Sequence, residues 1–126
     1  MYIDNYSISW ELFKEYYATN KLKFVHYPIY DFSDKDMRNK LRPAADALHH
    51  LVENKEIVYV HCTAGVNRSP SVISMYLCIY KNMTPSIAIH YVCLHRKWAS
   101  PNKAIIEEVY NLTVTKDKVN EPSKAQ

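Results

Sequence analysis

A single glycine, Gly65, constrains the fold of this chain more than any other residue. It is the only glycine among 126 residues and lies in the segment VHCTAGVNRSP, residues 60–70, between Cys62 and Arg68. Glycine adopts backbone conformations that other side chains obstruct, including close approach of the backbone to a ligand. A chain that uses glycine once is therefore predicted to curl tightly at this position.

This glycine lies in a loop that is predicted to join a buried strand to a buried helix. Residues 56–61 (EIVYVH) form a short, almost wholly apolar run, which is typical of a strand in a parallel sheet. Residues 70–81 are apolar on most sides, which predicts a central, buried helix. A loop of this kind is a natural anion site, because its N–H groups point inward and the helix dipole adds partial positive charge.

The side chains of the loop suit a phosphate group. A cysteine surrounded by N–H donors ionises near neutral pH, and the thiolate of Cys62 would be a competent nucleophile. Arg68 offers a planar fork that matches two phosphate oxygens. The loop is not a nucleotide-binding loop of the G-x-x-x-x-G-K-[ST] type, because it lacks the second glycine and the lysine. It is not a zinc site either, because no further cysteine or histidine follows His61 and Cys62 at the spacing of zinc ligands. We therefore expect a site that needs no metal and no cofactor.

The rest of the chain predicts one α/β domain with a central, parallel-rich sheet flanked by helices. Residues 21–31 (KLKFVHYPIYD) form a β-rich run, and Pro28 within it suits a strand end or a sheet edge. The spacing of apolar residues predicts further helices at residues 9–20, 37–54, 85–96 and 101–112.

Prolines and polar residues predict where these helices begin. The helix at residues 37–54 is expected to be entered afresh near Pro43, and Thr84 and Ser100, each followed by proline, are expected helix caps. Beyond residue 112 the sequence is polar and aperiodic. We therefore expect a catalytic domain at residues 1–112 and a polar, flexible tail at residues 113–126.

Composition and charge exclude several classes of partner. The net charge of +3 comes from 16 basic and 13 acidic residues that are interspersed, so no basic block favours nucleic acid. No apolar run approaches the ~20 residues that span a bilayer, and the N-terminus has no secretory-signal pattern. Three cysteines without paired spacing favour a reducing compartment. We expect an intracellular, cytoplasmic protein without nucleic-acid or membrane partners; the sequence leaves its oligomeric state open.

The string H-C-x-x-G-x-x-R-S resembles the phosphate loop of the cysteine-based protein tyrosine phosphatases. Together with the upstream segment HYPIYDFSDKDMRNKLRPA, it is similar to the atypical dual-specificity phosphatases, and closest to the glucan phosphatases (the laforin and plant starch phosphatase group). That group has a C-x-A-G-x-G-R loop, which Cys62, Ala64, Gly65 and Arg68 match, whereas Asn67 replaces its second glycine. The resemblance implies a dual-specificity phosphatase-like fold and a phosphoric monoester hydrolase.

The resemblance also implies catalytic roles. Cys62 is expected to attack phosphorus and form a cysteinyl-phosphate, and Ser69 to assist the later departure of the thiolate. Arg68 is expected to hold phosphate oxygens during this step. Asp31, the first aspartate of the D-F-x-D stretch, is the expected general acid and then base, with Asp34 as the alternative.

The expected substrate contacts come from the loop and from one aromatic residue beside the acid. The loop N–H groups would surround the phosphate, and an exposed aromatic ring could stack on a sugar or on phosphotyrosine. These residues are Thr63, Ala64, Gly65, Val66, Asn67, Arg68 and Phe32.

Two substrate classes and one further function stay open. Phosphoinositide phosphatases of this superfamily tend to carry lysines in the loop, and this loop has none. Phosphorylated protein and phosphorylated glucan are therefore the expected partners. The alternative function is a catalytically silent phosphate-binding or scaffold module. A rhodanese-like or arsenate-reducing enzyme is disfavoured, because such enzymes need no upstream aspartate.

The resemblance covers residues 1–112 but begins partway into the family's domain. We therefore expect an N-terminally truncated domain that lacks the first strands. In the family's sheet, one further strand lies between those predicted here at residues 21–31 and 56–61. Without it, these two would leave an empty slot or pair directly, and unpaired backbone is costly when it is buried.

Overall fold

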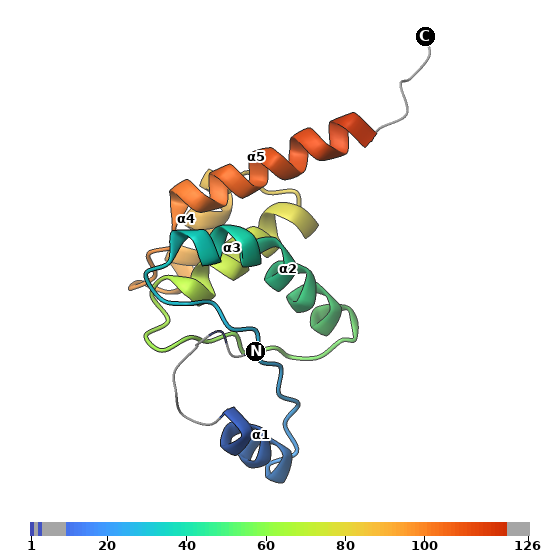
Figure 1. Cartoon of the computed structure of the whole chain (residues 1–126), viewed down its shortest axis with the longest axis vertical. Helices are drawn as coiled ribbons and strands as arrows, with labels where there is room; N and C mark the ends of the chain where they lie inside the picture. Colours follow the sequence, from blue (N-terminus) through green and yellow to red (C-terminus); the bar gives the residue numbers. More distant parts are fainter. Residues whose placement is uncertain (2, 4–9, 121–126) are drawn as a thin grey trace.

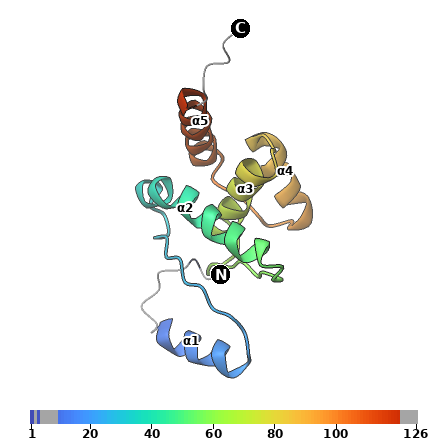
Figure 2. The ribbon, with the colours of Figure 1, turned by 90° about the vertical axis from the view of Figure 1, so that its right-hand side faces the viewer.

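The structure is a computed structural model that describes residues 1, 3 and 10–120. Helix α3 lies at its centre and packs against α2, α4 and α5, whereas α1 lies apart from them in both views (Figures 1 and 2). Within the described part of the chain, no helix is long and apolar enough to cross a membrane. The helices are α1 (Trp10–Thr19), α2 (Asp34–Glu53), α3 (Arg68–Tyr80), α4 (Pro85–His95) and α5 (Lys103–Asn120).

Helix α3 is buried on most sides, as its apolar sequence predicts. Even its two fully buried serines are satisfied. The hydroxyl of Ser74 donates to the carbonyl of Pro70 at 2.7 Å, and that of Ser71 donates to Asn67 Oδ1 at 3.2 Å. The helix begins at Arg68, two residues before the predicted start, so its first turn grows directly out of the loop.

Helix α2 is continuous, so the predicted fresh start near Pro43 is wrong. It begins after Ser33, whose hydroxyl accepts a hydrogen bond from the backbone N–H of Asp36 at 3.1 Å. Pro43 is exposed to solvent, while Leu41 and Ala44 are fully buried. Burial of the apolar face of α2 against α3 outweighs the ~3 kcal/mol that a proline costs inside a helix.

One of the two predicted helix caps is confirmed. The Thr84 hydroxyl accepts a hydrogen bond from a backbone N–H in the first turn of α4. The cap predicted at Ser100 is wrong, because Asn102 Oδ1 accepts the equivalent bond at the start of α5. The backbone N–H of Ser100 donates instead to the carbonyl of Val66 at 2.6 Å, which fixes Ser100 outside the helix.

Helix α5 continues to Asn120, past the end predicted at residue 112. Adding a residue to an existing helix gains one hydrogen bond for each residue fixed, so a polar sequence can extend it. Thr113 also bonds outside its helix, since its hydroxyl accepts from Arg42 Nη1 at 3.2 Å. The predicted flexible tail is thus helical to Asn120. Residues 121–126 lie outside the described part of the chain, and the domain boundary at residue 112 stays a prediction.

Two extended segments, residues 22–30 and 56–61, take the places of the predicted strands. The described residues form only isolated bridges, so the central sheet stays a prediction. Of the two expected alternatives, the empty slot is wrong at Ile3, which lies between the segments. The N–H of Ile3 donates to the His61 carbonyl at 2.9 Å, and the N–H of Ile29 donates to the Ile3 carbonyl at 3.3 Å. Ile3 is fully buried between them, where it satisfies backbone groups on both sides.

Replacement of Ile106 by alanine is expected to lower the free energy of unfolding by about 2–5 kcal/mol. The side chain is fully buried on α5, so its loss leaves a cavity. Urea denaturation followed by circular dichroism measures the change. Leu112→Ala is the control on the same helix, because Leu112 is 63% exposed, and it should change stability by less than about 0.5 kcal/mol. Equal effects would contradict the packing of α5.

Candidate active site

The loop of residues 62–68 turns at Gly65, as the sequence predicts. Gly65 has φ +65°, a left-handed conformation that strains other residues. The structure adds a second reason for glycine. A Cβ atom at this position would lie 2.8 Å from Nη2 of Arg96. Glycine is therefore favoured by the backbone conformation, and a larger residue here would also displace the Arg96 side chain from its place against the loop.

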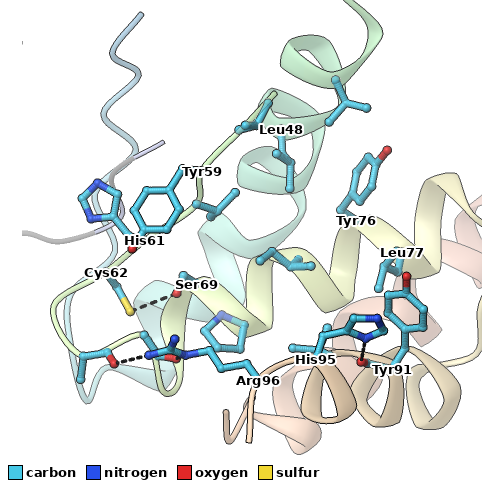
Figure 3. Close-up of a pocket in the computed structure, with 18 of the residues that line it drawn as sticks. Leu48, Tyr59, His61, Cys62, Ser69, Tyr76, Leu77, Tyr91, His95 and Arg96 are labelled. Carbon is cyan, nitrogen blue, oxygen red and sulfur yellow. Dashed lines mark hydrogen bonds between the residues drawn. The ribbon is translucent and has the colours of Figure 1, made fainter. Parts of the chain in front are cut away.

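Cys62 is buried at the start of this loop, with its sulfur directed toward Ser69 (Figure 3). The Cys62 Sγ and Ser69 Oγ atoms lie 3.4 Å apart. Burial raises the pKa of the Cys62 thiol, but hydrogen bonds from the Ser69 hydroxyl and from the backbone N–H groups of Ser69 and Gly65 lower it. The positive charge of Arg68 lowers it further, and the net pKa lies below its ordinary value. The site thus favours a thiolate.

Arg68 is buried at the first position of α3, and its guanidinium contacts three other parts of the chain. Its Nη1 atom donates to the carbonyls of Ile29 at 3.0 Å and Ile3 at 3.5 Å. Its Nη2 atom donates to the hydroxyl of Thr63 at 3.4 Å. Its Nε atom lies 3.5 Å from Oδ1 of Asp31. A buried charge needs such acceptors, and these fix the guanidinium beside the loop.

The three aspartates that follow the first extended segment have different surroundings. Asp31 faces Arg68, and its carboxylate is 45% exposed. Asp34 accepts a hydrogen bond from Asn102 Nδ2 at 3.2 Å. Asp36 accepts from the backbone N–H of residue 30 at 2.6 Å and pairs with a lysine in α2. The structure thus brings Asp31 to the arginine of the loop, while Asp34 bonds to the start of α5.

The other residues that we predict to contact the substrate differ in their exposure to solvent. Phe32 is 96% exposed beside Asp31 and has φ +57°, so its ring projects into solvent. Thr63, Ala64 and Val66 are exposed. Asn67 is half-buried, and its side-chain oxygen accepts from the Ser71 hydroxyl. The residue that replaces a glycine of the glucan group thus anchors the loop to α3.

Arg96 is a residue of the site that the sequence pattern did not identify. It follows α4, and its side chain reaches the outer side of the 62–68 loop (Figure 3). Its Nε atom donates to the Gly65 carbonyl at 2.8 Å, and its Nη2 atom donates to the Ala64 carbonyl at 3.3 Å. A basic residue in the run HRKW carries no signal of this contact, which depends on how α4 packs.

A pocket of about 480 Å³ borders the loop on the side of Arg96. Its walls come from α2, α3, α4 and residues 58–65, and most of the side chains that line it are apolar (Figure 3). The described residues include no group of three or more His, Cys, Asp or Glu side chains that could hold a metal ion.

His61 precedes the loop and lies against aromatic residues. Its ring stacks on Tyr59 with centroids 5.2 Å apart, and its Nε2 atom lies 3.5 Å from the hydroxyl of Tyr17 in α1. The ring of Tyr17 also stacks on Phe24 with centroids 5.1 Å apart. His61 therefore connects the extended segment before the loop to α1.

The arrangement combines three chemical functions. A thiol that ionises readily can attack an electrophile, N–H groups and a guanidinium can bind an anion, and a nearby carboxylate can exchange a proton. Cys62, Arg68 and Asp31 supply them within one site.

Comparison with known proteins assigns a family to this arrangement. Residues 4–114 match the family model described as the dual specificity phosphatase catalytic domain. Human dual specificity protein phosphatase 21 is 28% identical over 90 residues, which are 71% of this chain and 47% of the relative. Mouse laforin is 38% identical over 61 residues, which are 48% of this chain and 18% of laforin. The chain thus spans about half or less of the length of these relatives.

Solved structures support the same fold. The crystal structure of PTPMT1 has a TM-score of 0.73 at 18% identity, with 94% of this chain and 80% of that chain aligned. The crystal structure of Tk-PTP in the active form has a TM-score of 0.71 at 20% identity, with 88% of this chain and 74% of that chain aligned. At such low sequence identity, the similarity to these structures shows a shared fold and nothing further.

Iodoacetamide at about pH 7 is expected to modify Cys62 faster than Cys78. Alkylation needs the thiolate, and a lowered pKa enlarges the thiolate fraction below the ordinary pKa of a thiol. Burial raises the pKa of Cys78 to about 11, so that its thiol stays protonated. Mass spectrometry of the alkylated peptides measures both rates. Ser69→Ala should slow the reaction of Cys62 alone, and faster labelling of Cys78 would contradict the assignment.

Proposed function

This chain belongs to the dual specificity phosphatase family, and we propose that it is a cysteine-dependent phosphatase that hydrolyses phosphate monoesters through a cysteinyl-phosphate. One observation carries the proposal: the sulfur of Cys62 lies 3.4 Å from the Ser69 hydroxyl in a loop that leads into α3, whose first residue is the buried Arg68. The carboxylate of Asp31, 3.5 Å from that guanidinium, supplies the proton exchange that ester cleavage needs.

In the first step the Cys62 thiolate attacks phosphorus. The S–P bond forms as the P–O bond to the leaving group breaks, and Asp31 gives its proton to the departing oxygen. Arg68 and the loop N–H groups stabilise the phosphoryl oxygens as charge moves onto the leaving group. An incoming phosphate competes with the Asp31 carboxylate for Arg68, and the released carboxylate takes up from solvent the proton that it then gives to the departing oxygen.

In the second step a water molecule attacks the cysteinyl-phosphate. Asp31 accepts a proton from this water, the new P–O bond forms, and the S–P bond breaks to return the thiolate. Ser69 stabilises that thiolate through its hydroxyl, which lies 3.4 Å from the sulfur. The cycle needs Cys62 as a free thiol, and all three cysteines are free, so a reducing, intracellular compartment is part of the proposal.

The substrate classes that suit this site are phosphorylated protein and phosphorylated glucan. Phe32, almost fully exposed beside Asp31, can stack on an aromatic ring or on the face of a sugar. The similarity to laforin supports the glucan, and the similarity to dual specificity protein phosphatase 21 supports the protein. Assays of both classes decide between them.

Purified protein is expected to release phosphate from an aryl phosphate, and Cys62→Ser to lower turnover by about 10⁴-fold or more, because serine is not ionised at this position. Phosphate release measures both. The variant should still bind phosphate, since Arg68 and the loop N–H groups are unchanged. A folded Cys62→Ser variant that keeps its turnover would exclude Cys62 as the nucleophile.

Phosphorylated amylopectin and a phosphotyrosine peptide extend this test to the substrate class. Release that depends on Cys62 from amylopectin supports a glucan substrate, and release from the peptide alone supports a phosphoprotein. A folded protein that binds phosphate but releases none from any substrate would instead be a silent binding module.

Asp31→Asn is expected to lower kcat by about 10²-fold or more for a poor leaving group, because an amide cannot donate the required proton. Asp34→Asn is the matched control, since Asp34 bonds to Asn102 and not to Arg68. Equal losses in the two variants would remove the assignment of Asp31.

A further inference from the structure

Three consecutive carbonyl groups of the 62–68 loop accept hydrogen bonds from one short segment, residues 96–100. The guanidinium of Arg96 donates to the carbonyls of Ala64 and Gly65, at 3.3 Å and 2.8 Å. The backbone N–H of Ser100 donates to the carbonyl of Val66 at 2.6 Å. The outer side of the loop is therefore lined with carbonyl oxygens that all have partners in this segment.

These bonds determine where the loop N–H groups point. In a trans peptide the carbonyl and the following N–H are coplanar and point in opposite directions. With the carbonyls of Ala64, Gly65 and Val66 turned toward residues 96–100, the N–H groups of Gly65, Val66 and Asn67 point to the inner side. The hydrogen bond from the Gly65 N–H to the Cys62 sulfur agrees with this direction.

Gly65 makes this orientation easy to lose. A glycine peptide rotates with little steric resistance, so sterics alone do not fix the two planes next to it. Arg96 supplies the missing restraint, because its planar fork donates to both carbonyls at once. Its own backbone is fixed at the end of α4, where its N–H donates to the Val92 carbonyl at 2.9 Å.

We propose that Arg96 is a positioning residue of the loop, which keeps the N–H groups of Gly65 and Val66 directed at the Cys62 sulfur and at a bound phosphate. Arg96 acts from the side of the loop that carries these carbonyl groups. The expected effect of Arg96 on turnover rests on the proposed phosphatase function. Its expected effect on the ionisation of the Cys62 thiol does not. A Cβ atom at residue 65 would lie 2.8 Å from Arg96 Nη2 and would displace this side chain from the loop.

Arg96→Ala in the full chain tests the proposal, with two measurements. The first is the rate of Cys62 alkylation by iodoacetamide as a function of pH, which reports the thiolate without turnover. The second is kcat and KM for an aryl phosphate. Lys97→Ala is the matched control, because Lys97 is an adjacent exposed cation whose ammonium lies over the Trp98 ring, 5.2 Å from its centroid.

The expected results separate positioning from charge. In Arg96→Ala the alkylation profile moves to higher pH and kcat falls by about tenfold or more, as misplaced catalytic groups cause. Arg96→Lys recovers part of the change in the alkylation profile and part of the loss in kcat, because an ammonium keeps the charge but lacks the planar fork. Lys97→Ala matches the wild type, although it removes the same charge.

Other results would overturn the proposal. An Arg96→Ala protein with the wild-type alkylation profile and kcat excludes a positioning role, and an equal shift in Lys97→Ala reduces the effect to long-range charge. If Arg96→Ala does not fold, wild-type behaviour of folded Arg96→Lys excludes a need for the planar fork. If the wild type releases no phosphate but Arg96→Ala still moves the alkylation profile, the phosphatase function fails and the positioning role stands.

Discussion

The buried guanidinium of Arg68 is the constraint on which the rest of the site depends. A charge that is removed from water requires acceptors, and Arg68 finds them on the carbonyls of Ile3 and Ile29 and on the carboxylate of Asp31. These groups come from segments far apart in the sequence. Satisfying one side chain therefore brings the upstream aspartate to the first residue of α3.

The loop beside Arg68 has two chemically different sides. The carbonyls of residues 64–66 accept hydrogen bonds from residues 96–100, and the backbone N–H groups of Gly65 and Ser69 donate to the sulfur of Cys62. Burial alone would raise the pKa of this thiol, and it is the orientation of the N–H groups, with the Ser69 hydroxyl and the charge of Arg68, that reverses the direction. The lowered pKa of this thiol is thus a property of the packed loop as a whole.

Hydrogen bonds through α3 connect the loop to the starts of α5 and α2. Its buried Ser71 donates to Asn67 in the loop and accepts from the N–H of Asn102 at the start of α5. Asn102 in turn donates to Asp34 at the start of α2. This chain of hydrogen bonds gives Asp34 a structural partner, while Asp31 stays beside Arg68. Two aspartates three residues apart thereby acquire different surroundings.

The local sequence was sufficient to predict the loop, the tight turn at its glycine and the helix that follows. Adjacent residues carry those signals: an apolar run, a residue without Cβ, and a cysteine and an arginine at fixed spacing. Only tertiary structure decided that Ile3 lies between the two extended segments, that α2 continues through Pro43, and that Arg96 contacts the loop. Each of these depends on the burial of one face or the pairing of backbone groups distant in the chain. Such contacts leave no pattern among neighbouring residues.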